Sequence, residues 1–123
     1  MDHDQLISDR IIGAAIEVHR QLGPGLLETP YKRALCIELR YQALRVETSR
    51  QIPMQYRGEL IGEYIPDLIV ENTVVVEVKS VSHLEPVFTA QVVTYLRITN
   101  LRVGLLLNFN APKLVDGLKR VVL

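Results

Sequence analysis

A chain of 123 residues has room for one modest hydrophobic core, so we expect a single domain over residues 1–123. The composition, 48% hydrophobic and 23% charged without a long apolar run, argues against a membrane protein and against a disordered chain. A formal net charge of zero excludes a globally basic nucleic-acid-binding surface. No signal-peptide pattern opens the sequence, which predicts a cytoplasmic protein.

The first half of the chain reads as two helices followed by an extended segment. Residues 4–22 carry apolar side chains at helical spacing, and Gly23-Pro24-Gly25 ends the pattern. A second helix is predicted to begin between Glu28 and Pro30, because proline is tolerated in a first turn, and to end near Gln42. Residues 44–57 contain β-formers without a helical stripe and are expected to be extended.

The second half predicts strands joined by a helix. Residues 60–70 and 73–79 flank a turn and are expected to form an antiparallel hairpin. Ser82 and Glu85 have the spacing of a capping box, which predicts a helix from there to about Asn100.

The apolar stretch at 103–109 is typical of a strand buried on both faces, and its position after that helix predicts a right-handed parallel crossover. A short final strand follows Asp116-Gly117. We therefore expect an α/β domain with a small mixed β-sheet flanked by helices.

Two charged residues lie inside the valine-rich strand. Side chains alternate along a strand, so Glu77 and Lys79 share one face, which we expect to be polar, while Val76 and Val78 pack on the other. Asp67 joins Glu77 if the hairpin loop is residues 71–73, whereas a shift of one residue turns Asp67 to the opposite side.

Two carboxylates and a lysine on one sheet face suit a divalent cation that acts on a phosphodiester. Asp67 and Glu77 are the candidate ligands for Mg²⁺ or Mn²⁺, with the carbonyl of Val78 as a third. Lys79 is the candidate catalytic residue that positions the attacking water, helps to deprotonate it or stabilises the developing negative charge. The alternative interpretation is that Glu77 and Lys79 are exposed charges that protect an edge strand from aggregation.

These residues resemble known motifs. Pro66-Asp67 followed by Glu77-Val78-Lys79 resembles the PD-(D/E)xK nuclease superfamily, and the Gln91 to Tyr95 spacing matches the Gln-x-x-x-Tyr motif of its RecB-like members. The stretch from Gly25 through Glu28 to Tyr31 is similar to the signature of the GxxExxY protein family, which is classed with these nucleases. The likeness to that family extends over nearly the whole chain.

The resemblance implies a restriction-endonuclease-like core and further site residues. Glu28 is expected to be a catalytic acid that faces the metal, and Gln91 with Tyr95 is expected to line the substrate site. Tyr31 is expected to orient Glu28 or to contact a phosphate. Alternatives remain open: Glu28 is also a favourable charge in a first helical turn, Tyr31 also suits a core position, and Gln91 with Tyr95 also suits the boundary of an amphipathic helix.

The sequence therefore predicts a metal-dependent nuclease that hydrolyses phosphodiester bonds in DNA or RNA. The basic segments 30–57 and 102–123 are the candidate surfaces for the nucleic-acid backbone, and a homodimer or a protein partner stays open as a source of further positive surface. Two other functions also remain open: a non-enzymatic module that binds nucleic acid or protein, and a metal-dependent hydrolase of small nucleotides.

Overall fold

Two amphipathic helices open the chain. The computed structural model describes residues 2–123, in which α1 spans His3–Leu22 and α2 spans Glu28–Tyr41. α1 begins where the Asp2 side chain accepts a hydrogen bond from the Gln5 N–H (2.8 Å), and it ends at Gly23, which has a φ of 68°. Both predicted helices are confirmed.

A mixed five-stranded sheet forms the centre of the molecule, with strand order β1-β4-β5-β6-β7. The pair β5–β6 is parallel and the other neighbouring pairs are antiparallel, so the predicted mixed sheet with a parallel crossover is confirmed. Helix α3 makes the crossover, and a short 3₁₀ helix, η1, precedes β7. The bounds are β1 Val46–Glu47, β4 Leu68–Val70, β5 Val74–Lys79, α3 Pro86–Thr99, β6 Val103–Asn108, η1 Leu114–Gly117 and β7 Leu118–Val122.

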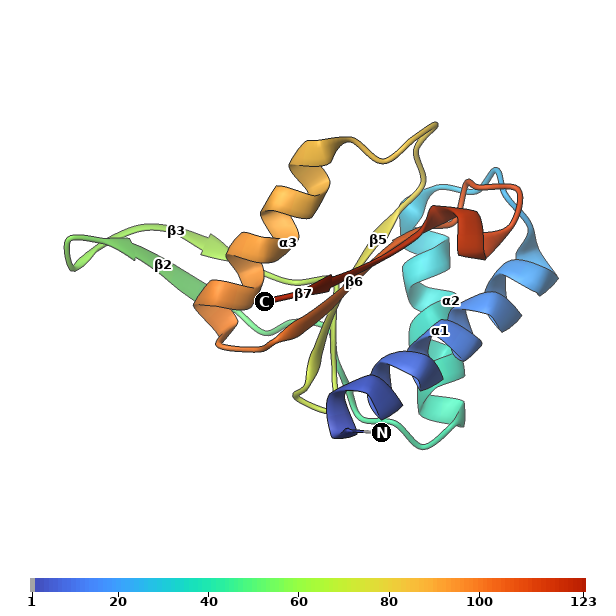
Figure 1. The fold of residues 1–123 in the computed structure, drawn as a ribbon, viewed down its shortest axis with the longest axis horizontal. Helices are drawn as coiled ribbons and strands as arrows, with labels where there is room; N and C mark the ends of the chain where they lie inside the picture. Colours follow the sequence, from blue (N-terminus) through green and yellow to red (C-terminus); the bar gives the residue numbers. More distant parts are fainter. Residues whose placement is uncertain (1) are drawn as a thin grey trace.

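The prediction of one continuous strand over residues 60–70 is wrong. The first part is β3, Glu59–Tyr64, which pairs with β2, Ile52–Tyr56, in a separate two-stranded sheet that projects from the domain (Figure 1). Only residues 68–70 pair with β5. The break falls around Pro66, because proline lacks an N–H for the ladder and restricts the residue before it.

The predicted capping box at Ser82 and Glu85 is also wrong. Helix α3 begins at Pro86, and Glu85 occupies its N-cap position without a side-chain capping bond. Proline suits the first helical position because its missing N–H has no partner in an α-helix there, and its fixed φ favours the helix. Ser82 lies in a bend before the helix.

Two hydrophobic cores lie on opposite faces of the sheet. α1 and α2 cover one face and α3 covers the other (Figure 1). Val76 and Val78 belong to the core under α1 and α2, whereas Val75 belongs to the core under α3. All six residues of β6 are buried, which confirms the strand that is apolar on both faces. The Glu77 face is therefore polar only at its end, because α3 covers the remainder.

The length and polarity of the helices bear on whether one of them could cross a membrane. Within residues 2–123, none of them combines the length with the apolar character that crossing a bilayer requires. Cys36 is buried in the core under α1 and α2.

Candidate metal and catalytic site

The pairing of β4 with β5 brings the two candidate metal ligands together. Leu68 pairs with Val76 and Val70 with Val74, and residues 71–73 form the loop between the strands. Of the two registers considered from the sequence, this is the one on which the pairing of Asp67 with Glu77 depends. Continued by one pair beyond Leu68, it sets Asp67 opposite Glu77 at the end of the hairpin.

Asp67 is held by contacts from strand β5 and helix α2. Its Oδ2 atom accepts a hydrogen bond from the backbone N–H of Val78 at 2.8 Å, and the Nζ atom of Lys32 lies 3.7 Å from Oδ1. Lys32 belongs to α2, so this helix supplies a cation to the site. The sequence reasoning missed Lys32, although its spacing of four residues from Glu28 puts both side chains on one helix face.

Glu77 is a buried carboxylate in the middle of a sheet. The residue is 7% exposed, and burial raises the pKa of its carboxyl from the ordinary value of 4.5 to about 7. The positive charges of Lys79 and Lys32 and the backbone amide of Asp67 oppose this rise in pKa, while the negative charge of Glu28 adds to it.

The buried position of Glu77 excludes the edge-strand interpretation. Strand β5 is paired on both sides, with β4 and with β6. The interpretation of Glu77 and Lys79 as exposed charges that protect a sheet edge is therefore wrong. A carboxylate that is largely removed from water needs a charged or hydrogen-bonding partner, which makes this position a candidate functional site.

Two stacked tyrosines cover Glu77. The hydroxyl of Tyr64, the last residue of β3, donates a hydrogen bond to Oε1 of Glu77. The Tyr64 ring stacks on the ring of Tyr95 from α3, with centroids 3.3 Å apart and an interplanar angle of 13°. Burial raises the pKa of Tyr95, and the negative charges of Glu77 and Asp67 raise it further.

The sequence did not predict the role of Tyr64, because the direction of its side chain depends on the break between β3 and β4. In a continuous strand from residue 60 to 70, Tyr64 would alternate regularly toward one face of the main sheet. The break frees β3 to pair with β2, and Tyr64 reaches Glu77 from that second sheet. An aromatic residue shortly before Pro66 was the only available signal.

Lys79 and Gln91 differ in how they are held. Lys79 is half-buried at the end of β5, and its Nζ atom lies 4.7 Å from the centroid of the Phe88 ring in a cation–π contact. Gln91 is exposed on α3, one turn before Tyr95. The Gln91 side chain makes none of the hydrogen bonds found among residues 2–123, so its substrate-lining role stays a prediction.

Tyr31 and Glu28 occupy different environments although both belong to the α2 N-terminus. Tyr31 is fully buried, its ring stacks on Phe109 at 4.7 Å, and its hydroxyl donates to the Gly23 carbonyl at 2.5 Å. The Leu26 N–H donates to the same hydroxyl at 3.1 Å. Tyr31 therefore orients the loop before α2 and neither bonds to Glu28 nor faces solvent. Glu28 is exposed as the first residue of α2.

The loop before α2 is also tied to the end of β5. The Ser80 hydroxyl donates to the Leu26 carbonyl at 2.5 Å. His19 supports a neighbouring loop, since its Nε2 atom lies 2.8 Å from the carbonyl oxygen of Ala111. The motif from Gly25 to Tyr31 thus builds the connection that sets α2 against the end of β5.

The donor set suits a cation that keeps much of its own hydration. Among residues 2–123, no three acidic, histidine or cysteine side chains gather closely enough to form a complete metal cluster. Mg²⁺ needs only one or two protein carboxylates when waters and a substrate phosphate fill the other positions. Asp67 and Glu77 fit that requirement, and Glu28 stands outside the pair.

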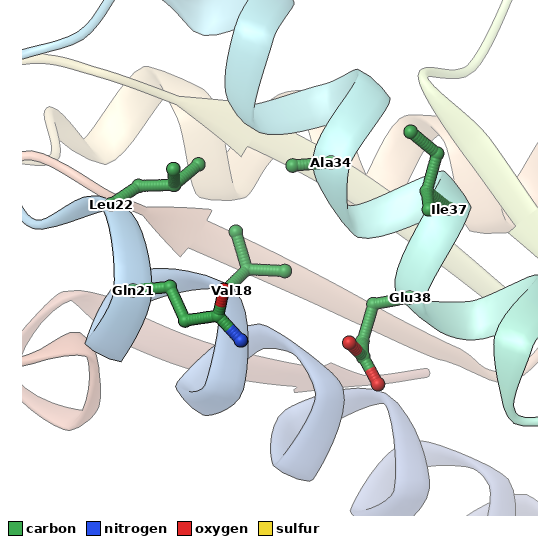
Figure 2. Close-up of a pocket in the computed structure, with 6 residues that line it drawn as sticks. All are labelled: Val18, Gln21, Leu22, Ala34, Ile37 and Glu38. Atoms are coloured by element: carbon green, nitrogen blue, oxygen red, sulfur yellow. The ribbon is translucent and has the colours of Figure 1, made fainter.

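A hollow of about 190 Å³ between α1 and α2 lies apart from these residues (Figure 2). It contains none of the predicted site residues. Its lining is Val18, Gln21 and Leu22 from α1 and Ala34, Ile37 and Glu38 from α2. With one carboxylate and no cation, this hollow does not have the chemistry of a metal or phosphate site.

Comparison with known proteins agrees with this arrangement. A family model described as the PD-(D/E)XK nuclease superfamily matches residues 5–121. No curated protein and no solved structure matches the chain. The match covers all the strands of the main sheet and the three α-helices except for a few terminal residues. The chain therefore belongs to the PD-(D/E)XK nuclease superfamily.

Proposed function

We propose that this protein is a metal-dependent nuclease that hydrolyses phosphodiester bonds in DNA or RNA. The observation that carries the proposal is the buried carboxylate of Glu77 in β5, which lies beside Asp67, the residue just before the paired strand β4. A carboxyl with a pKa near 7 is half ionised at neutral pH, and a bound cation offsets the cost of the ionised form. PD-(D/E)XK nucleases generally use divalent metal ions.

In this proposal Asp67 and Glu77 hold Mg²⁺ or Mn²⁺, and the carbonyl of Val78 is the third protein ligand. Glu28 assists from the α2 N-terminus, directly or through a water. The ion, when bound, supplies acidity to a water and positive charge to the phosphate. Tyr64 keeps Glu77 oriented through its hydrogen bond.

Lys79 is the proposed catalytic cation. Its contact with Phe88 holds the ammonium at the end of β5, on the same side of the strand as Glu77. From there the ammonium positions the attacking water or stabilises charge that develops on the phosphate, and taking a proton from that water would require the neutral amine form of Lys79. Gln91 and Tyr95 line the substrate side, with Tyr95 acting through its stack on Tyr64. Tyr31 contributes by holding the loop before α2.

Finer assignments follow from the same residues. We propose that the chain belongs to the GxxExxY family, because the motif from Gly25 to Tyr31 forms a connected structural unit. The cytoplasm is its proposed location. The basic segments 30–57 and 102–123 are proposed to face the nucleic acid, and a homodimer or a protein partner is proposed to extend this surface.

A calorimetric titration with Mn²⁺ tests the metal site directly. The parent protein should bind Mn²⁺, more tightly when a short non-cleavable oligonucleotide is present, because phosphate completes the coordination shell. Asp67→Asn should lose binding under both conditions, while Glu59→Gln, an exposed acid on the projecting hairpin, should bind as the parent does.

Two results would contradict the proposal. Equal Mn²⁺ binding by Asp67→Asn would remove Asp67 from the ligand set. No binding by the parent under either condition would favour an interaction module that keeps the nuclease fold. If metal binds, competition between mononucleotides and oligonucleotides separates a nuclease from a hydrolase of small nucleotides.

A further inference from the structure

A second hollow lies along the outer face of α2. Its volume is about 310 Å³, and we call it the α2 groove. Its lining residues come from α2 and from the segment after β1: Lys32, Arg33, Cys36, Ile37, Arg40 and Thr48. Because residues three and four apart share a helix face, Arg33, Ile37 and Arg40 present one continuous side of α2 to this groove.

The α2 groove is lined by cations without an acid. Arg33 is exposed and makes none of the hydrogen bonds or ion pairs found among residues 2–123. Arg40 is held in place by donating from Nη2 to the Val46 carbonyl at 3.1 Å, which leaves its other donors available. The nearby acid Glu47 is occupied, since it accepts a hydrogen bond from Nε of Arg50 at 2.9 Å. This charge distribution suits an anion.

The groove begins at the candidate metal site. Lys32 lines the groove and also lies 3.7 Å from Oδ1 of Asp67. Arg33 and Arg40 are seven residues apart on α2, which corresponds to about 10 Å along the helix. Because a nucleotide in a stacked strand advances by at least about 3.4 Å along the axis, this length accommodates more than one phosphate. The length of the groove from Asp67 along α2 therefore fits a chain of linked phosphates better than a single phosphate.

An exposed aromatic ring lies at the far end. Tyr41, the last residue of α2, is 86% exposed, and it is one turn beyond Ile37, which is 69% exposed. A cationic groove that leads to an exposed aromatic side chain is the combination by which proteins bind single strands, because unpaired bases stack on such rings. In a duplex, base pairing and stacking hide those base faces.

We propose that the α2 groove binds the phosphate backbone of a single-stranded nucleic acid on one side of the cleaved bond, and that Tyr41 stacks on an unpaired base. Lys32 contacts the phosphate nearest to Asp67, and Arg33 and Arg40 contact the following ones. This inference rests on the proposed function, to which it adds the strandedness of the substrate and its direction across the domain.

Fluorescence anisotropy with a short labelled single-stranded oligonucleotide, in the presence of EDTA, measures this binding without metal and without cleavage. Arg33→Gln should weaken binding about threefold to tenfold. It should also make the negative slope of log K against log salt shallower by about 0.7, because one phosphate contact is lost. Arg33→Lys should recover most of the affinity. Tyr41→Ala should weaken binding about fivefold or more and leave the salt slope unchanged.

Arg20→Gln is the matched control. Arg20 carries the same charge on α1, pairs with Glu17 and lines a different hollow beside η1. It should bind the oligonucleotide as the parent does. The inference is overturned if Arg33→Gln and Arg20→Gln bind equally well, and its single-strand part is overturned if a duplex of the same length binds the parent as tightly.

The two proposals fail separately. If Mn²⁺ does not bind but Arg33→Gln weakens the oligonucleotide complex, the α2 groove stands as a nucleic-acid site and the nuclease assignment falls. If Mn²⁺ binds at Asp67 but Arg33→Gln has the affinity of the parent, the metal site stands and the strand must follow another path.

Discussion

The two faces of the sheet are built for different tasks. The core under α1 and α2 contains 21 buried residues of the described chain, whereas the core under α3 contains seven. The larger core is continuous along β5 and β6. The smaller one ends at Glu77, where Tyr64 and Tyr95 replace aliphatic side chains. The protein therefore gains most of its hydrophobic stabilisation on one sheet face and keeps its perturbed carboxylate on the other.

The largest expected effect is on activity and concerns the α3 face. Lys79→Ala should lower the rate of oligonucleotide hydrolysis by about a hundredfold or more, because it removes the proposed catalytic cation. Mn²⁺ affinity measured by calorimetry should stay near that of the parent, since Lys79 is not a ligand. Hydrolysis at the parent rate would show that Lys79 only packs against Phe88.

The next effect compares the two cores through neighbouring residues of β6. Leu105 and Leu106 are both fully buried, the first in the larger core and the second in the smaller one. Each substitution by alanine should lower the free energy of unfolding by about 2–5 kcal/mol, with Leu105→Ala at the upper end, because more side chains lose contacts around it. Urea denaturation measures both values. A larger loss for Leu106→Ala would contradict the view that the core under α1 and α2 contributes more stability than the core under α3.

The pH dependence of stability should report the burial of Glu77. Because its carboxyl has a pKa of about 7 in the folded protein and an ordinary value of 4.5, the folded state binds more protons than the unfolded state between these values. The free energy of unfolding should therefore fall as pH rises from about 4.5 to about 7, by up to roughly 3 kcal/mol.

Glu77→Gln separates this contribution from that of other groups. In EDTA, the substituted protein should lose less stability than the parent over that pH range, because glutamine does not ionise. Denaturation curves at several pH values measure the difference. Parallel pH profiles for the two proteins would mean that Glu77 titrates as an ordinary exposed carboxyl.

The smallest expected effect concerns Tyr64. Tyr64→Phe removes the hydroxyl that bonds to Glu77 and keeps the ring that stacks on Tyr95. Mn²⁺ affinity should fall about tenfold, as is usual when a group that orients a metal ligand is lost. Tyr56→Phe is the matched control, because Tyr56 is 62% exposed on the same projecting hairpin. An unchanged affinity in Tyr64→Phe would leave Glu77 oriented by its strand alone.

Sequence reasoning succeeded where the signal was local. Of the registers that the sequence left open, the structure has the one with residues 71–73 as the loop, which sets Asp67 beside Glu77. The two-faced burial of β6 followed from its unbroken apolar run. The prediction from sequence failed around Pro66 and at Ser82. A proline overrode a β pattern in the first case and a capping pattern in the second.

The order of elements and the placement of two acids near one hairpin follow from periodicity and from the alternation of neighbouring side chains, so they can be inferred without the structure. Only the tertiary structure decided which distant groups meet that pair. Lys32 belongs to α2 and Tyr64 to a separate sheet. The spacing of Lys32 from Glu28 indicates a shared helix face, but it does not indicate that this face meets Asp67. Helix packing and the break at Pro66 determine these contacts, since side chains remote in sequence come together only when the cores on both sheet faces have formed.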